Sequence, residues 1–403
     1  MAQQGEIHNL RLVSHSDLGG FGNIGEGVAL QQASDGRRVL WLAHEGPPKD
    51  VTAVDVSDPA SPRVVAQTEL PHQQIRSNSL AVVDDLLLVA YQVSRPGVSD
   101  AGMGVYDISR PEEPKRISFF DTSGPSSRGT HCLWCVDGKY AHLSTGAADF
   151  IPTHPKDDQF HMIVDIGDPA RPTEVGRWWL PGTREGDGTP PPIRHPEHDV
   201  GYRVHNVNVY PDRPDRAYLG YVDAGIVILD IADLSHPRMV TQLDYHPPLT
   251  GFTHTVLPLF DRGLLVVAEE ASEYDNCEDW PKVVWVVDSS VETNLVMLST
   301  LPTDKDKYCA IPGRYGAHNL HENLPVPTSH VSDTIVYSTF FNAGLRVHDI
   351  SDPFRPQEIA YFVPPVPEGA RANSVNDVYV DEGELIYTVD RIKGGLYILE
   401  PAW

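Results

Sequence analysis

The chain has 403 residues, of which 40% are hydrophobic and 22% charged, and its formal net charge is −25. This charge repels nucleic-acid phosphates and anionic lipid headgroups, so we expect neither nucleic acid nor a membrane surface as a partner. The acidic residues are scattered, and solubility is the simplest interpretation of the charge itself. No signal-like segment and no window of roughly eighteen apolar residues is present, so we expect a cytoplasmic protein.

Cysteines and turn formers narrow the class of fold. Four cysteines are too few for a disulfide framework. Cys132 and Cys135 form a CxxC pair, but positions three apart on a β-strand face opposite sides, so we expect buried thiols rather than a zinc or redox site. The 35 prolines and 32 glycines are spread along the chain, which is typical of many short strands joined by tight turns.

A phrase of about twenty residues recurs, in which an apolar run ends at Asp, passes a turn that usually contains proline, and continues as a second extended run. Its copies begin at Val51, Met103, Phe160, Gly225, Val283 and Gly344, with a last one in the C-terminal GGLYILEPAW. Most copies follow another pair of apolar runs separated by a turn. Four strands per unit, repeated at roughly 50 residues, is the pattern of propeller blades. The sequence therefore predicts an all-β, seven-bladed β-propeller that forms one domain over residues 1–403.

The two ends of the chain complete each other. The last unit stops after its third strand, and the N-terminal EIHNLRLVSHSDL has the apolar pattern of the missing fourth strand. Pairing the two would close the ring and remove an open sheet edge. Two longer insertions, at about residues 150–159 and 181–202, are expected to lie on one face as lid-like loops.

One position recurs where the first strand of each unit begins. Along the chain this column holds Asn23 and Glu26, Asn78, His131, His205, His254, His318 and Asn373. First strands line the central channel of a propeller, so equivalent positions form a ring around its axis. Imidazole is a frequent ligand for zinc, copper, iron and nickel, so four histidines on consecutive blades predict a metal site. The alternative is a plug of hydrogen-bonded histidines.

The second strand of each unit returns to the same face and brings further polar groups toward the ring. We expect Glu270 to orient an imidazole there, Asp223 to contribute as a carboxylate, and Arg314 to receive an anion. Weaker candidates of the same kinds are Asp149, Glu269, Asn342, Asp390 and Arg391, the arginines Arg203 and Arg371, and the histidines His195, His198 and His321. A nucleophile elbow, a P-loop and an HExxH motif are absent from the sequence.

The runs VTAVD, MIVDI and IVILD resemble the repeat of the LVIVD family, which implies a propeller. A smaller set of segments, THCL at 130–133, RVHNV at 203–207 and GLRVHDISDP from Gly344, is similar to the selenium-binding protein and methanethiol oxidase family. Those enzymes are described as copper-dependent, so this resemblance implies a histidine-bound metal. Four histidines on a seven-bladed propeller are also similar to the iron site of carotenoid-cleavage oxygenases.

The leading hypothesis is a mononuclear four-histidine oxidoreductase or oxygenase with iron or copper, zinc being the third option as cofactor. Its substrate would be a small molecule, aromatic or anionic, in the axial channel. A metal-dependent hydrolase or lyase at the same site is one alternative. The other is a non-catalytic propeller that binds a protein or peptide on its acidic face. The sequence leaves the oligomeric state open.

Overall fold

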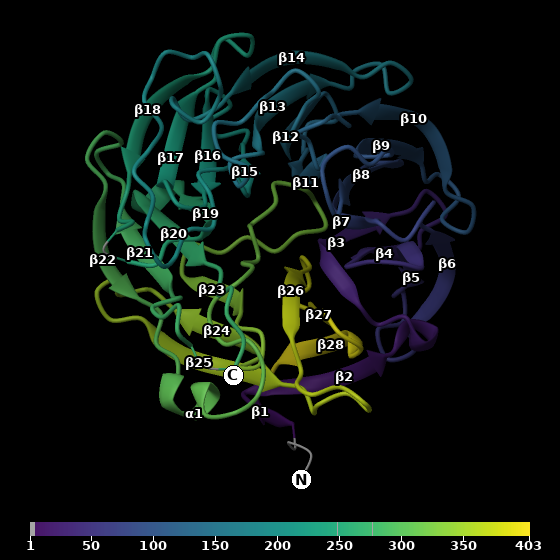
Figure 1. Cartoon of the computed structure of the whole chain (residues 1–403). Coiled ribbons are helices and arrows are strands. Elements are labelled where there is room, and N and C mark those ends of the chain that lie inside the picture. Colours follow the sequence, from purple (N-terminus) through teal and green to yellow (C-terminus); the bar gives the residue numbers. More distant parts are fainter. Residues whose placement is uncertain (1–4, 248, 276) are drawn as a thin grey trace.

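The protein is a ring of seven four-stranded antiparallel sheets around a central axis, as predicted (Figure 1). The structure, a computed structural model, describes residues 5–247, 249–275 and 277–403. Residues 1–4, 248 and 276 of the predicted single domain lie outside these ranges. No helix among the described residues has the length and apolar character needed to cross a membrane.

Each blade numbers its strands from the axis outward. Blade one holds β3 (Ile24–Gln32), β4 (Arg38–His44), β5 (Lys49–Asp55) and β6 (Arg63–Glu69). Blade two holds β7 (Ile75–Val83), β8 (Leu86–Val93), β9 (Gly102–Asp107) and β10 (Lys115–Asp121). Blade three holds β11 (Thr130–Trp134), β12 (Tyr140–Thr145), β13 (Phe160–Asp165) and β14 (Thr173–Trp178). Blade four holds β15 (Val207–Asn208), β16 (Arg216–Tyr221), β17 (Gly225–Asp230) and β18 (Arg238–Leu243).

The other three blades follow the same order. Blade five holds β19 (Thr253–Leu259), β20 (Leu264–Glu269), β21 (Val284–Asp288) and β22 (Val296–Thr300). Blade six holds β23 (Ile335–Thr339), β24 (Leu345–Asp349), β25 (Gln357–Val363) and β1 (Glu6–His8). Blade seven holds β26 (Val375–Val380), β27 (Ile386–Asp390), β28 (Gly395–Pro401) and β2 (Leu10–Ser16). The helical segments are η1 (Leu18–Gly20), η2 (Phe260–Arg262) and α1 (Lys305–Cys309).

The recurring aspartate of the repeat has one structural task. At the end of the third strand its carboxylate accepts a hydrogen bond from the backbone N–H two residues later, which forms the turn into the outer strand. The six aspartates that do so are Asp55, Asp107, Asp165, Asp230, Asp288 and Asp349, with distances of 2.7 to 3.0 Å. The apolar run before each aspartate is buried because neighbouring blades cover both faces of the strand.

The N-terminal segment closes the ring in two places. Strand β2 pairs with β28 from Leu10 opposite Pro401 to Ser16 opposite Leu396, and so supplies the fourth strand of blade seven as predicted. Strand β1 pairs with β25 on the outside of blade six. Blade six thus reaches four strands through β1. On the axial side of β23, where the other blades have their innermost strand, the described residues form a single bridge between Leu320 and Ser338.

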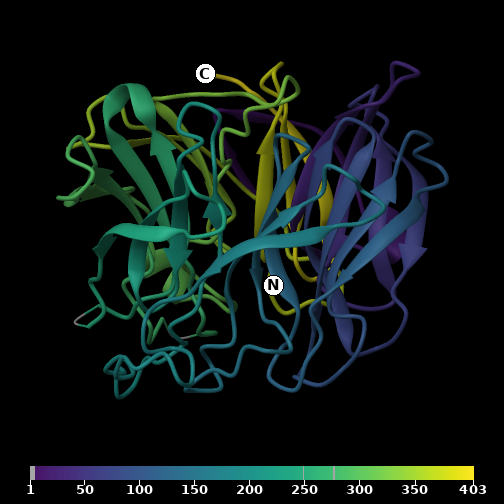
Figure 2. The same cartoon turned by 90° about the horizontal axis from the view of Figure 1, so that it is seen from above.

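The segment that follows this bridge crosses the channel, and we call residues 321–330 the axial plug (Figure 1). Its Glu322 accepts hydrogen bonds from Asn208 of blade four, and the Thr328 hydroxyl donates to the Leu30 carbonyl of blade one. The plug therefore spans the ring at the far ends of the innermost strands. Long loops between about residues 150 and 200 gather on one face of the ring, which we call the loop face (Figure 2).

The two predicted insertions hold each other. The Thr153 N–H donates to the Thr183 carbonyl, and the Glu185 N–H donates to the Ile151 carbonyl, both at 2.9 Å. Arg194 of the second insertion adds a two-pronged ion pair with Asp157 of the first, at 2.9 and 3.0 Å. The two loops thus form one connected layer over blades three and four.

A disulfide joins Cys277, in the loop after β20, to Cys309 at the end of α1. The sequence predicted no disulfide framework, and it gave no sign of this single bridge, because two irregular loops far apart in sequence meet on the loop face. Cys132 and Cys135 are free and buried, as expected. Disulfides are most frequent in proteins of oxidising compartments, and a cytoplasmic location stays a prediction.

Ring closure can be tested on one strand with two leucines. Leu10 of β2 is 7% exposed and packs among residues of blades six and seven, whereas Leu12 on the same strand is 42% exposed. We expect Leu10→Ala to lower the free energy of unfolding by about 2 to 4 kcal/mol, since it leaves a cavity at the closure. Leu12→Ala is the matched control and should cost less than about 1 kcal/mol. Equal losses in urea unfolding would contradict this account of closure.

Candidate metal centre

The four predicted histidines meet at the axis of the propeller. The Nε2 atoms of His131 and His205 lie 2.8 Å apart. The ring centroids of His205 and His254 are 3.9 Å apart, and those of His254 and His318 are 4.7 Å apart. All four side chains are buried, so distant parts of the sequence bring four imidazoles to one point in the channel.

A β-bulge in the innermost strand turns four of the ring residues toward the axis. The pairing register skips one residue at the start of β7, β11, β19 and β26, and the skipped residues are Asn78, His131, His254 and Asn376. A bulge re-aims the side chain of its extra residue. The ring position in blade seven is therefore Asn376 and not Asn373, as the sequence alignment had it. Asn373 lies before β26 and donates instead to the Asn342 carbonyl.

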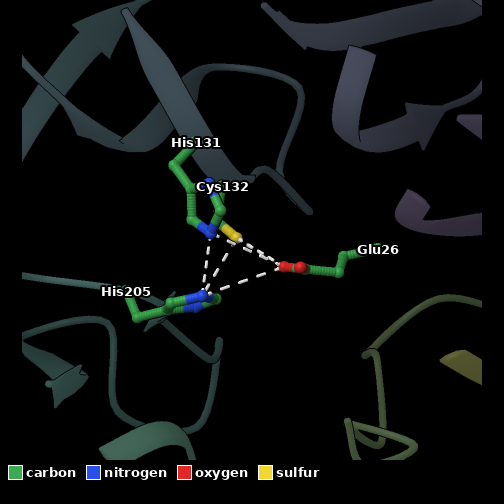
Figure 3. Close-up of side chains that lie close together, drawn as sticks. All are labelled: Glu26, His131, Cys132 and His205. Atoms are coloured by element: carbon green, nitrogen blue, oxygen red, sulfur yellow. Dashed lines mark hydrogen bonds and ion pairs between the residues drawn. The ribbon is translucent and has the colours of Figure 1, made fainter. Parts of the chain in front are cut away.

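Blade one contributes a carboxylate to the cluster (Figure 3). An irregularity of β3 between Ile24 and Val28 places Glu26 in the channel. Its Oε2 lies 3.7 Å from His131 Nε2 and 3.8 Å from His254 Nε2, and its Oε1 lies 3.6 Å from His318 Nε2. The sequence placed Glu26 in the column without a ligand role. The flanking glycines in Gly-Glu-Gly are the signal that could have singled it out.

Each imidazole is oriented by a partner on its Nδ1 atom. Gln92 Oε1 lies 3.0 Å from Nδ1 of His131, and Asn206 Oδ1 lies 2.8 Å from Nδ1 of His205. The partners of the other two are Thr255 Oγ1 for His254 and the Asn376 carbonyl for His318, both at 2.7 Å. Such partners fix which nitrogen carries the proton and leave the Nε2 lone pair for a metal. The Nε2 atoms of His254 and His318 are buried without a hydrogen-bond partner.

The dimensions of the cluster fit one ion. Two donors at about 2.1 Å from the same metal lie at most roughly 4.2 Å apart. The separations between the Nε2 atoms and the nearest Glu26 oxygens are 3.6 to 3.9 Å, and the closest pair of nitrogens is at 2.8 Å. The potential ligands form three overlapping groups: Glu26 with His131, Cys132 and His205; Glu26 with His254 and His318; and Glu270 with His205 and His254. Glu26 belongs to two of these groups and lies within ligand-to-ligand distance of all four imidazoles.

The protonation states also suit a cation. Burial lowers the pKa of His131 and His254, and it lowers the pKa of His205 to about 3, so these rings are neutral at physiological pH. Burial would raise the pKa of Glu26, but His254 and His318 outweigh it and hold this pKa well below its usual range. His131, His205 and His254 thus present neutral nitrogens and Glu26 an ionised carboxylate, which are the states that bind metals.

Glu270 contacts the ring from the end of β20, as the sequence predicted for an orienting group. Its oxygens lie 3.7 Å from the Nε2 atoms of His205 and His318, and Arg314 donates to it at 2.7 Å. Burial favours the protonated form, but the charges of His318 and Arg314 prevail and lower the pKa of Glu270 to about 2. Glu270 is therefore ionised at neutral pH.

Asp223 lies away from the imidazoles. It accepts hydrogen bonds from the N–H groups of Val200 and Gly201, at 2.7 and 2.6 Å, and so holds the end of the second insertion. Burial raises its pKa to about 6. A catalytic role for Asp223 stays a prediction, and its contacts describe a support for the loop.

The remaining candidates divide by location. Arg371 pairs with Asp275, and its side chain is 74% exposed. His195 stacks near His246 on the loop face, while His321 belongs to the axial plug and receives a hydrogen bond from the Val380 N–H. None of these three takes part in the cluster of metal-ligating groups found among the described residues.

Cys132 and Arg76, two groups near the ring, received no role there from the sequence, and a third, Arg391, was only a weak candidate. Cys132 Sγ lies 3.7 Å from Glu26 Oε2 and 3.8 Å from His205 Nδ1, so this thiol faces the site. Arg76 Nη2 lies 3.3 Å from His131 Nδ1, and Arg391 Nη1 lies 4.0 Å from Glu26 Oε1. Their signal in the sequence is weak, because each becomes part of the site only through a neighbouring blade.

Comparisons with known proteins support the fold. The chain contains LVIVD repeats, since the model of this family matches residues 48–68, 158–179 and 215–244. No curated protein sequence matches the chain. The β-propeller domain of Cps50 (Swd1) from Myceliophteria thermophila is similar with a TM-score of 0.57 and 14% identity, over 98% of this chain and 99% of that one.

Two further solved structures share the architecture. A chain of the mitotic checkpoint complex has a TM-score of 0.55 and 11% identity, over 100% of this chain and 96% of that one. The periplasmic gluconolactonase of Pseudomonas aeruginosa has a TM-score of 0.53 and 15% identity, over 83% of this chain and 85% of that one. At these identities the likeness shows the propeller fold alone.

The role of Asp223 can be separated from catalysis by two substitutions. Asp223→Ala leaves two N–H groups without an acceptor, at a cost of about 1 to 3 kcal/mol each, and should expose residues 181–202 to proteases. Asp223→Asn keeps an acceptor oxygen and should protect the loop. The pKa of Asp223 rises from 3.8 to about 6 on folding, so its contribution to the free energy of unfolding falls as the pH rises from 3.8 to about 6. Asp223→Asn should remove this pH dependence. Equal protease sensitivity of the two variants would contradict the support role.

The glycines beside Glu26 offer a test of its placement. A Cβ atom on Gly27 would lie 2.7 Å from the backbone nitrogen of Leu80, so Gly27→Ala must shift β3. We expect zinc affinity, measured by calorimetric titration, to fall roughly tenfold, as for other changes beside metal ligands. Gly46→Ala is the control, because its Cβ would meet no atom within 4 Å. Unchanged zinc affinity in Gly27→Ala would show that the close contact between Gly27 and Leu80 does not position Glu26.

Proposed function

We propose that the protein is a metal-dependent enzyme in which His131, His205, His254, His318 and Glu26 hold one iron or copper ion. The observation that carries this proposal is the position of the Glu26 carboxylate, 3.6 to 3.9 Å from the Nε2 atoms of all four buried histidines. The ion would act on a small molecule that reaches it from the loop face. A bound iron or copper would supply redox chemistry, and we favour an oxidoreductase or oxygenase.

The number of donors supports a redox metal over zinc. Catalytic zinc usually has three protein ligands and one open position, and structural zinc has four. Five donors exceed both numbers, whereas an octahedral iron or a five-coordinate copper still has room for a substrate or oxygen. Imidazole suits both of these metals, and Glu26 offsets part of their charge.

Glu270 and Arg314 would position groups at this site. With its pKa lowered to about 2, Glu270 is a poor proton donor near neutrality and acts as a hydrogen-bond acceptor. Arg314 fixes Glu270 through the 2.7 Å hydrogen bond and lies against the ring of Phe341, with 4.5 Å from its guanidinium carbon to the ring centroid. Both would shape the mouth of the site rather than transfer protons.

A hydrolase at the same centre is the second candidate. It is favoured by the shared fold with a gluconolactonase, and a metal with histidine and carboxylate ligands can activate water as well as oxygen. The two candidates differ in the ion required. A hydrolase would be active with zinc alone, whereas an oxidoreductase would need iron or copper and would consume an oxidant.

Elemental analysis of protein purified without a histidine tag tests the proposal. We expect about one iron or copper per chain, and a loss of at least roughly tenfold in occupancy for His254→Ala with the fold retained by circular dichroism. His195→Ala is the control, because this histidine lies outside the ring, and it should keep the metal. Trace metal that His254→Ala leaves unchanged would reject the proposal and favour the non-catalytic interpretation. Stoichiometric zinc would select the hydrolase.

A further inference from the structure

One arginine at the mouth of the site has no counter-ion. Arg203 lies two residues before His205, and within the described parts of the chain its guanidinium has no hydrogen bond or ion pair, with Nε buried. The neighbouring arginines are all paired: Arg76 and Arg391 with Glu45, Arg128 with Asp158, and Arg314 with Glu270. A buried charge without a partner is costly, and its presence beside a candidate site points to a ligand.

The surroundings of Arg203 do not compensate its charge. Burial lowers the pKa of Arg203, and the fields of Asp158 and Asp223 do not restore it. The positive charge of Arg128 also lowers the pKa of Arg203, which means that the two guanidinium groups repel each other electrostatically. One positive charge is thus left over in a region where the other cations are matched by carboxylates.

There is room for a ligand on this side of the ring. A cavity of about 300 Å³, at the lower end of the size of small-molecule pockets, is lined by Arg76, Gln92 and Arg128, among others. Arg203 is not among its lining residues, but Arg128 is near enough to act on Arg203 electrostatically. Gln92 and Arg76 both contact His131, so the cavity lies one side chain from the candidate metal ligands. On the other side of the ring the axial plug leaves a cavity of only about 60 Å³.

Aromatic side chains border the ring. The ring centroid of Phe252 lies 5.7 Å from that of His205, and the centroid of Phe341 lies 4.5 Å from that of His318. Phe252 stands just before the bulge of β19, and Phe341 stands just after β23, which puts both at the loop-face end of the ring. Phe341 is 0% exposed and lies beneath the Arg314 guanidinium, whereas Phe252 is 6% exposed, so of the two rings it is Phe252 that a flat apolar group could contact.

We propose that the mouth of the site binds a small aromatic monocarboxylate, whose carboxylate is received by Arg203 and whose ring lies against Phe252. This inference rests on the proposed function, since it names the substrate class of the same site. A guanidinium fork matches a planar carboxylate with two parallel hydrogen bonds. A monoanion balances the single unpaired charge, whereas a phosphate dianion would be repelled by Glu45, Asp158 and Glu270.

Calorimetric titration of the full-length protein with benzoate tests this inference. We expect benzoate to bind, and benzamide, its neutral isostere, to bind at least about tenfold more weakly. Arg203→Met should weaken benzoate about 10- to 100-fold, and Arg203→Lys, which keeps the charge but not the fork, should fall between. Arg371→Met is the matched control at an exposed arginine and should bind as the native chain does.

Two outcomes would overturn the inference: equal affinity of the native chain for benzoate and benzamide, or tighter binding of inorganic phosphate than of benzoate. The ratio of benzoate to benzamide uses no variant, so it decides the matter even if Arg203→Met fails to fold. A chelator-treated sample separates this inference from the proposed function. Benzoate binding that depends on Arg203 in metal-free protein would support the receptor even if no iron or copper were found. Full metal occupancy together with benzoate binding that does not depend on Arg203 would refute the carboxylate site at Arg203 and leave the proposed metal site standing.

Discussion

The candidate site depends on a bulge at the start of the innermost strand, which recurs in blades two, three, five and seven. Without the extra residue, the side chains of this strand would alternate between the two faces of the blade, and none would be directed along the channel wall to the axis. With it, each of these blades offers one side chain to the centre. The choice of residue at that position then decides whether the channel holds amide groups, as in Asn78 and Asn376, or metal-ligating imidazoles.

Burial and charge act together on this ring. Burial lowers the pKa of His131, His205 and His254 and would raise the pKa of the carboxylates. His254 and His318 nevertheless hold the pKa of Glu26 low, and His318 and Arg314 hold that of Glu270 low. The site therefore concentrates two negative charges among the imidazoles, with arginines beyond them on the loop face. This arrangement attracts a cation to the centre and an anion to the mouth, which are the two ligands that the proposals assign.

Repetition explains how much the sequence could predict. The seven blades, the closure by the N-terminal strand and the meeting of the four histidines follow from units that share one pattern. Errors and omissions occur where the pattern breaks. The alignment chose Asn373 over Asn376 because both lie in an irregular stretch. The disulfide of Cys277 and Cys309, the contacts of Glu26 and the lack of a counter-ion for Arg203 among the described residues depend on how loops and blades meet, which no periodicity reports.

The axial plug has a consequence for traffic through the molecule. Residues 321–330 follow closely after His318 and cross one end of the channel. Hydrogen bonds hold this segment to blades one, four and seven. A small molecule that enters from the loop face would therefore leave through the same face, so substrate entry and product release would share one opening. Because His318 lies only three residues before the axial plug, a displacement of the plug would also displace this imidazole.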